Sequence, residues 1–185
     1  MPRLSPELKE FQQRRDLVSI ERAGIDAYSI QAFILDFSRE LVLLQKIDDF
    51  RPDGLLVLRC ADISGCKSGA TNQFQKTLLQ EEGVLEKVDF RFRAPLQSFD
   101  SFLNWLPPDE IVILEDELCD KTDFLIGPVL SVDESVVSIR YITGAGNWEN
   151  EPQEMSIDRI TSCQIRSSYI SFYARYVQRQ ERKES

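Results

Sequence analysis

The feature that most constrains the fold of this chain is an internal repeat. The segment 34–44 (ILDFSRELVLL) returns as 129–139 (VLSVDESVVSI), at an offset of 95 residues. Further along, the segment 63–66 (ISGC) returns as 160–163 (ITSC), at an offset of 97 residues. Two copies of one small fold, with a slightly longer loop in the second copy, explain both matches.

Length and composition limit the number of domains and the class of protein. With 185 residues, of which 42% are hydrophobic and 29% charged, the chain has the composition of a soluble globular protein of one or two domains. A core built from a single copy of roughly 70 residues is marginal. The two copies are therefore expected to pack on each other or on a partner.

Turn residues and apolar patterns predict the order of elements. Segments dense in β-formers are 28–37, 40–47 and 55–60 in the first copy, and 110–115, 124–132, 135–142, 154–157 and 162–165 in the second. Helices are expected over 6–13, 70–82, 99–106 and 167–178, and a further strand over 84–92. The expected organisation is a polar segment at 1–15, a first barrel with its helix at 16–82, a structured linker at 83–109, a second barrel with its helix at 110–180 and a tail at 181–185.

Three local patterns carry finer expectations. The segment 38–40 (SRE) is typical of a tight hairpin connection, whereas 48–54 (DDFRPDG) predicts a longer turn because of its Pro and Gly. Asn72 followed by Gln75 resembles a capping box at the start of a helix.

Short strands, tight hairpins and a brief apolar turn before the last strand of each copy predict a small, strongly bent β-barrel. At this point the chain resembles the Sm-like family, within the class of SH3-like barrels. In the second copy, the segment from Gly127 to Asp133 (GPVLSVD) matches the first Sm signature, a Gly followed by spaced apolar residues and an Asp. In the first copy, Ala32 stands at the Gly position and Ser38 at the Asp position. The resemblance implies a mainly β fold with helices (α+β), built from two tandem Sm-like barrels that are each followed by a helix.

The resemblance also implies a function that the residues do not support. Sm-like proteins that bind RNA hold a base with an Asn after the Asp hairpin and with an Arg-Gly pair in a later strand. Val42 and Val137 stand at the Asn position, and no Arg-Gly pair occurs near 62–66 or 158–163. Valine has no amide to read a base edge, and the aromatic platform and positive channel of single-strand binding are missing. RNA binding by the family's usual route is therefore not expected.

The net charge of the chain also disfavours nucleic-acid binding. A formal charge of −9 and a pI of about 4.7 disfavour nucleic acids and anionic membranes as partners, because binding by counterion release needs clustered Lys and Arg. The first residues contain no apolar signal region, and no apolar run reaches the ~20 residues that cross a bilayer. We expect a cytoplasmic protein with no membrane contact.

The inventory of reactive side chains excludes the common catalytic dyads. The chain has no histidine, so Ser-His and Cys-His pairs are impossible, and its cysteines form no C-x-x-C pair. Those cysteines are Cys60, Cys66, Cys119 and Cys163. Cys66 and Cys163 occupy equivalent repeat positions and are expected to be small buried hydrophobes. Cys119 is expected near the surface, where Glu117 and Asp120 oppose thiolate formation.

No metal, cofactor or catalytic residue is predicted. The acidic segment 115–123 (EDELCDKTD) has no ligand spacing of the calcium-binding type, and solvated hairpin loops explain it. No glycine-rich loop is suited to hold a phosphate.

Two regions are candidate interaction surfaces. The last helix carries an aromatic stripe, and the loop 143–150 (TGAGNWEN) places an aromatic residue at its tip. The candidate interface residues are Trp148, Tyr169, Tyr173 and Tyr176. The end of the same helix carries a candidate basic patch, Arg175, Arg179, Arg182 and Lys183, diluted by Glu181 and Glu184. The aromatic residues alternatively form a seam against the barrel, and the basic residues a solvated helix end.

Taken together, these patterns predict a non-catalytic module for protein–protein interaction or assembly, with an unknown protein partner or with itself. The alternative is a nucleic-acid-associated protein that has kept the barrel without the uridine pocket. A third, less favoured alternative is a carboxylate-dependent enzyme. Sm-like domains often close into rings, so the two copies either supply two positions of a ring or pair with each other inside one chain.

Overall fold

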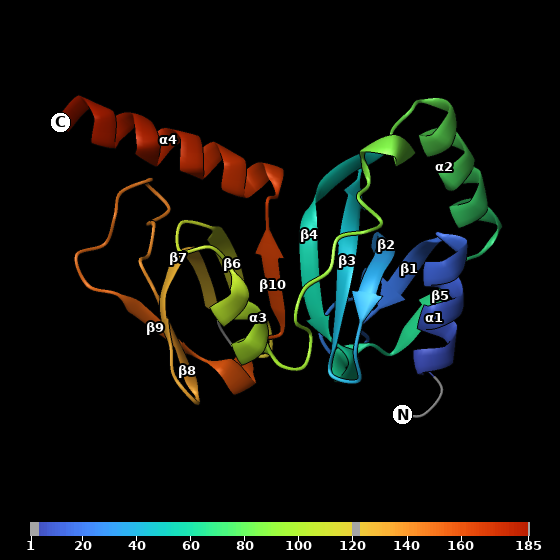
Figure 1. The fold of residues 1–185 in the computed structure, drawn as a ribbon, viewed down its shortest axis with the longest axis horizontal. Helices are drawn as coiled ribbons and strands as arrows, with labels where there is room; N and C mark the ends of the chain where they lie inside the picture. Colours follow the sequence, from blue (N-terminus) through green and yellow to red (C-terminus); the bar gives the residue numbers. More distant parts are fainter. Residues whose placement is uncertain (1–3, 120–122, 185) are drawn as a thin grey trace. The chain divides into compact units, whose positions relative to one another are not determined.

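The structure, a computed structural model, describes residues 4–119 and 123–184. The chain divides into two compact units, Met1–Ser98 (unit 1) and Phe99–Ser185 (unit 2). Each unit contains five antiparallel strands and at least two helices, so the expected α+β class is confirmed (Figure 1). The segment expected as a linker, 83–109, contributes its first part to unit 1 and its last part to unit 2.

Unit 1 begins and ends with helices around a five-stranded sheet. Its elements are α1 (Leu4–Arg14), β1 (Leu17–Glu21), β2 (Ile30–Phe37), β3 (Leu41–Asp48), β4 (Arg51–Arg59), the 3₁₀ turn η1 (Cys60–Asp62), β5 (Gly65–Lys67), α2 (Ala70–Glu81) and the 3₁₀ turn η2 (Leu85–Lys87). The strand order is β5-β1-β2-β3-β4, and every pair is antiparallel. Leu8 and Phe11 of α1 pack on the apolar face of this sheet, which is why a helix of otherwise polar sequence is stable there.

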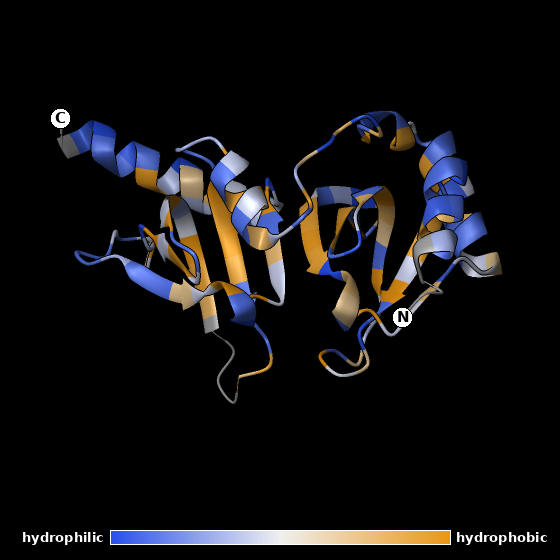
Figure 2. Ribbon diagram, turned by 60° about the horizontal axis from the view of Figure 1, so that its bottom comes forward, coloured by the Kyte–Doolittle hydropathy of each residue, from blue (hydrophilic) through white to orange (hydrophobic). Residues whose placement is uncertain are grey.

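Unit 2 repeats this plan. Its elements are α3 (Phe99–Trp105), β6 (Ile111–Asp116), β7 (Asp123–Val132), β8 (Val136–Ile139), β9 (Gln153–Ser156), the 3₁₀ turn η3 (Ile157–Arg159), β10 (Ser162–Ile165) and α4 (Ser168–Glu184). The strand order β10-β6-β7-β8-β9 is the order of unit 1 with each strand replaced by its equivalent. In both units hydrophobic residues gather on the strands, whereas the helices present mostly hydrophilic ones (Figure 2).

The two units share hydrogen-bond register as well as strand order. The second strand of each has a bulge, at Leu35 and at Leu130, which stand 95 residues apart. The hairpin that follows is closed by the same 2.8 Å bond, donated by the backbone N–H of Ser38 and of Asp133 to the carbonyl three residues on. The 3₁₀ turns η1 and η3 lie 97 residues apart, as the second sequence match does. The repeat therefore includes matching bulges, hairpin hydrogen bonds and 3₁₀ turns, which the sequence patterns alone did not predict.

Neither sheet closes into a barrel among the described residues. The ladders join β5 to β1 and β3 to β4 in unit 1, and β10 to β6 and β8 to β9 in unit 2. No ladder of the described residues joins β4 to β5, or β9 to β10, which closure would require. Within each unit the five strands thus form an open antiparallel arrangement, and the two arrangements have the same topology.

Three local predictions are wrong. The segment 84–92 is not a strand: it forms η2 followed by turns, because Phe90 packs edge-on against Phe33 of the sheet, with ring centroids 5.5 Å apart. The segment 48–54 is not a long turn but a two-residue hairpin, since Asp48 pairs directly with Arg51. Asn72 bonds back to the N–H of Gly69 rather than forming a box with Gln75.

The hairpin between β3 and β4 holds two residues in the left-handed conformation. Asp49 has φ 44° and Phe50 φ 60°, the signs of a type I′ turn, in which Asn and Gly are preferred. A left-handed conformation costs a residue with a side chain about 1–2 kcal/mol.

We expect Phe50→Gly to stabilise the protein by about 1 kcal/mol, because glycine removes this conformational cost from the turn. Thermal unfolding followed by circular dichroism should show a midpoint raised by about 4–8 °C if unit 1 unfolds as a separate unit. Phe50→Ala is the control, since it removes the exposed ring but keeps the Cβ atom. Equal midpoints for the two variants would contradict the role assigned to the turn.

Candidate functional site

Helix α4 is the element on which most candidate residues meet. It lies on the sheet of unit 2 and buries Ile170 and Val177 in a cluster with strand residues of β6 and β7. Ile170 and Val177 are one i, i+7 pair, so they fix which side of the helix faces the sheet. The remaining circumference of the helix carries the aromatic and basic side chains.

Trp148 is held against the end of α4 rather than standing free at a loop tip. Its indole N–H donates a 3.0 Å hydrogen bond to Glu181, and the guanidinium of Arg140 lies 3.9 Å from the ring centroid. Arg140 also lies 3.6 Å from the same carboxylate. Trp148 therefore contributes to a seam between the loop and the helix, and it is half-buried.

The tyrosines of α4 form a connected group at its N-terminal half. Tyr169 and Tyr173 stack with centroids 4.9 Å apart, and Phe124 of β7 meets Tyr169 edge-on at 6.0 Å. The Tyr169 hydroxyl bonds to that of Tyr173, which donates to the carbonyl of Gly144 at 3.1 Å. The hydrogen bond to Tyr173, together with partial burial, raises the pKa of Tyr169 to about 12.

A surface of four aromatic residues results, which we call the aromatic surface: Tyr169, Phe172, Tyr173 and Tyr176. Phe172 is 68% exposed, Tyr169 49% and Tyr176 40%. Phe172 was not among the predicted interface residues, although its position three residues after Tyr169 and four before Tyr176 places it on the same flank. The pattern alone could have identified it.

A shallow hollow of about 190 Å³ lies where this surface meets the loop 144–146. Phe172, Tyr173 and Tyr176 form its helix side, and the backbone of Gly146 its loop side. Gly146 has φ 78°, and a Cβ atom there would come within 2.7 Å of the Tyr176 ring. Glycine at this position allows the ring to lie directly on the loop.

The predicted basic residues are exposed along the same helix. Arg175 stacks on Phe172, with the guanidinium 4.8 Å from the ring centroid, and Arg179 donates a 3.0 Å bond to the carbonyl of Arg175. Arg182 and Lys183 extend the exposed series to the last turn. Basic and aromatic candidates, predicted as separate features, are thus brought together.

A second, more polar hollow of about 300 Å³ lies in unit 1, lined by Arg15 and the loop 86–91. Arg15 covers the Phe90 ring at 4.8 Å, and basic and acidic side chains alternate around the rim. Because both signs of charge are present, the hollow favours neither an anionic nor a cationic ligand, and we assign it no function.

Cys60, Cys66 and Cys163 lie in surroundings that keep their thiols protonated. Cys163 is buried in β10, and Cys60 and Cys66 pack half-buried against the unit 1 core. Burial raises the pKa of Cys60 to about 11 and that of Cys66 to about 12, with smaller contributions from Glu40 and Glu7. Burial also raises the pKa of Cys163. Cys119 is half-buried, and its neighbours 120–122 lie outside the described residues.

At about pH 8, we expect iodoacetamide to alkylate Cys60, Cys66 and Cys163 far more slowly in the folded protein than in urea, because only the thiolate attacks. Mass spectrometry of each peptide measures the rates. In the unfolded chain these thiols ionise above about pH 8.5, so the stability that their burial provides is complete below that pH. It falls as the pH rises toward 11–12. Equal alkylation rates for Cys163 in both states would contradict this expectation.

One pair of charged residues, of which the carboxylate is buried and the guanidinium exposed, has its signs reversed between the two units. The Asp116 carboxylate, at the end of β6, lies 2.5 Å from the Arg159 guanidinium in η3. The equivalent positions in unit 1 are Arg22 and Asp62, with the charges reversed. The 3₁₀ turn and last strand of one unit, placed in the other, would bring like charges together, which disfavours such an exchange.

Comparison of the chain with protein-family models, with curated proteins and with solved structures finds no match. Within residues 4–119 and 123–184, no three His, Cys, Asp or Glu side chains are grouped as a metal site requires. No helix of the described chain is long and apolar enough to cross a membrane. The functional interpretation therefore depends on the aromatic surface and its surroundings.

Proposed function

We propose that this protein is a non-catalytic module for protein–protein interaction or assembly, and that a protein partner docks on the aromatic surface of α4. The observation that carries the proposal is the exposure of Phe172 and Tyr176 at the edge of a hollow, with the exposed Tyr169 nearby on the same helix, which is already anchored by its opposite face. Aromatic residues of this kind dominate the binding energy of protein interfaces.

The size of the hollow supports a protein partner over a small-molecule ligand. Its volume of about 190 Å³ is below the 300–1,000 Å³ of typical ligand sites. It is wide and shallow enough to accept one projecting side chain of a partner, while the exposed ring of Phe172 supplies contact area beside it.

We further propose that each unit is derived from an Sm-like barrel. The strand order β10-β6-β7-β8-β9, the 3₁₀ turn before the last strand and the Gly127 bend support this assignment in unit 2, and the shared register extends it to unit 1. An assembly through sheet edges would then give a discrete multiple of 21.4 kDa in light scattering.

The double variant Phe172→Ser/Tyr176→Ser tests the proposed docking surface. A photoreactive phenylalanine analogue at position 172 identifies the protein cross-linked there, and the purified partner is then titrated by calorimetry. We expect the double variant to weaken binding at least about tenfold, because both rings belong to the contact.

Phe74→Ser is the matched control, since Phe74 is an aromatic residue of α2 that is 63% exposed. It should leave the affinity unchanged, and circular dichroism should show all variants folded. A partner or a self-association that tolerates the double variant as well as it tolerates Phe74→Ser would refute the docking surface, as would a failure to cross-link any protein at position 172.

A second candidate function, contact with nucleic acid, has the exposed basic end of α4 in its favour. A gel-shift titration with single-stranded RNA and DNA at low salt tests it. Because such binding arises from phosphate neutralisation, it should be strongest at low salt, and no shift at micromolar protein would end this alternative.

A further inference from the structure

We infer that the exposed flank of α4 binds an acidic segment of its partner protein, in which carboxylates alternate with apolar side chains. This inference rests on the proposed docking function and goes beyond it by naming the chemistry of the partner. It follows from where the helix places its aromatic rings, its cations and its carboxylate.

Rings and cations occupy one continuous line along the helix. Phe172, Tyr176, Arg179 and Lys183 follow each other at i, i+4, i+7 and i+11, the spacing of residues on a single helix face. We call these four residues the α4 stripe. Arg175 borders the stripe, with its guanidinium over the Phe172 ring. A segment that lies along the stripe meets two rings and then two cations.

The carboxylate of Glu181 does not neutralise the stripe. Glu181 lies on the other flank of the helix, where it accepts the hydrogen bond from Trp148 and faces Arg140. It is the only carboxylate of α4 among the side chains that the structure describes. The cations of the stripe therefore face outward with their charge available, which favours a partner of opposite charge.

The remainder of unit 2 limits how long an anionic partner can be. Residues 99–165 contain fourteen acidic and three basic residues, so the surface beyond the helix repels negative charge. A nucleic acid or an anionic membrane would extend into this region. A short acidic segment confined to the stripe is less affected, because salt screens charges more than about 8 Å away.

The hollow adds a requirement for an apolar residue in that segment. It is lined by three rings and by the loop 144–146, with hardly any polar surface, so a carboxylate would lose hydration there without a hydrogen-bond partner. An aliphatic side chain of the partner fits the hollow, while the carboxylates next to it reach Arg175 and Arg179. Alternating acidic and apolar residues satisfy both sites.

The test uses the full chain and three fluorescent peptides of equal length, each with leucine at every third or fourth position. The other positions are Glu in the first peptide, Gln in the second and Lys in the third. By fluorescence anisotropy we expect the Glu peptide to bind at least about tenfold tighter than the Gln peptide. The advantage should vanish in about 1 M salt, where the Debye length is about 3 Å.

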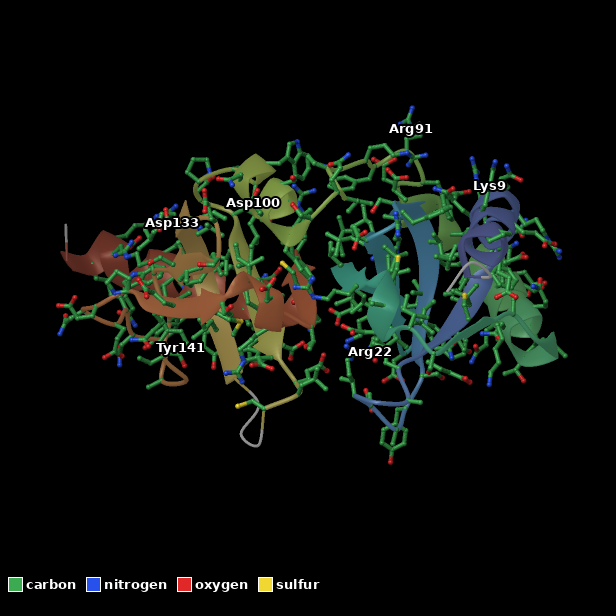
Figure 3. All side chains as sticks on the ribbon, turned by 90° about the horizontal axis from the view of Figure 1, so that it is seen from below. Lys9, Arg22, Arg91, Asp100, Asp133 and Tyr141 are labelled. Carbon is green, nitrogen blue, oxygen red and sulfur yellow. The ribbon has the colours of Figure 1, made fainter. Side chains whose placement is uncertain are left out.

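Two double variants separate the stripe from the general charge of the protein. Arg175→Gln/Arg179→Gln should remove most of the preference for Glu over Gln. Arg39→Gln/Arg91→Gln changes the net charge equally but at exposed positions of unit 1, and it should leave the preference intact; Arg91 projects outward in Figure 3. Retention of the preference in the α4 variant, or its loss in both, would overturn the inference.

The remaining outcomes distinguish this inference from the docking function itself. Equal binding of the Glu and Gln peptides, abolished by Phe172→Ser/Tyr176→Ser, refutes the acidic partner and leaves the docking surface in place. Absence of binding by all three peptides refutes the acidic partner, and the cross-linking experiment then decides about docking separately. Tighter binding to a poly-uridine oligonucleotide or to phosphatidylserine vesicles, lost in Arg175→Gln/Arg179→Gln, overturns the inference in favour of a polyanion.

Discussion

Gly127→Ala should prevent unit 2 from folding, or destabilise it by about 4 kcal/mol or more. Gly127 has φ 157°, and a Cβ atom built on it would lie 1.9 Å from the carbonyl oxygen of Arg140. That oxygen is fixed, because the backbone bonds of Arg140 to Pro128 and of Ile142 to Ile126 bracket the glycine. Relief of the overlap therefore requires the loss of these bonds as well.

The repeat supplies a matched control for this prediction. Ala32 is the equivalent residue of unit 1, buried in a regular ladder in which it pairs with Lys46. Ala32→Gly should cost about 1–2 kcal/mol, from the added freedom of the unfolded chain and the lost methyl burial. Substitutions at two equivalent positions of the fold are thus expected to differ severalfold in the free energy by which they destabilise their units.

Intrinsic tryptophan fluorescence reports selectively on unit 2, which Gly127→Ala is expected to destabilise, because both tryptophans of the chain, Trp105 and Trp148, lie in that unit. Urea unfolding of Gly127→Ala should show the native fluorescence signal already lost or its midpoint greatly lowered. Ala32→Gly should change the circular dichroism transition more than the fluorescence transition. A wild-type fluorescence midpoint in Gly127→Ala would show that the backbone segment around Arg140 moves aside freely.

Local sequence patterns predicted most elements of this fold because each is determined by nearby residues. The strand expected at 162–165 has those bounds, and the helix expected at 70–82 runs over Ala70–Glu81. The repeat offsets reappear as matched bulges and 3₁₀ turns. By contrast, the segment 84–92 has the composition of a strand but does not form one. Its Phe90 ring packs edge-on against the ring of Phe33, and a contact between residues so far apart in sequence is not visible in the local pattern.

The candidate site was predictable in composition and not in arrangement. Helical spacing placed Tyr169, Tyr173 and Tyr176 near each other, and it equally implied Phe172. The position of Trp148 depends on a hydrogen bond to Glu181, which a loop sequence does not reveal. The hollow depends on the positive φ of Gly146, which the sequence permits without requiring.

A buried polar cluster in unit 1 was also missed, because its members are distant in sequence. Asn72 of α2 lies over the cross-strand pair Ser19 and Gln31, and its amide donates to Ser19 at 3.0 Å and to Gln31 at 2.9 Å. Its oxygen accepts the N–H of Gly69 at 3.0 Å. The pattern around Asn72 suggested a capping box with Gln75 and none of these contacts, so its role in attaching α2 to the sheet became visible in the structure alone.

Asn72→Ala should destabilise unit 1 by about 2–3 kcal/mol. The substitution leaves the Gly69 N–H and the Gln31 oxygen without their partner, and each orphaned buried group costs about 1–3 kcal/mol unless water reaches it. Urea unfolding followed by circular dichroism measures the loss, whereas tryptophan fluorescence, which reports on unit 2, should change less. Gln75→Ala on the same helix is the control and should be neutral or slightly stabilising, because alanine has the higher helix propensity. Equal midpoints for the two variants would mean that α2 is attached by its apolar contacts alone, such as that of the buried Leu79, and that the amide cluster adds nothing to the stability of unit 1.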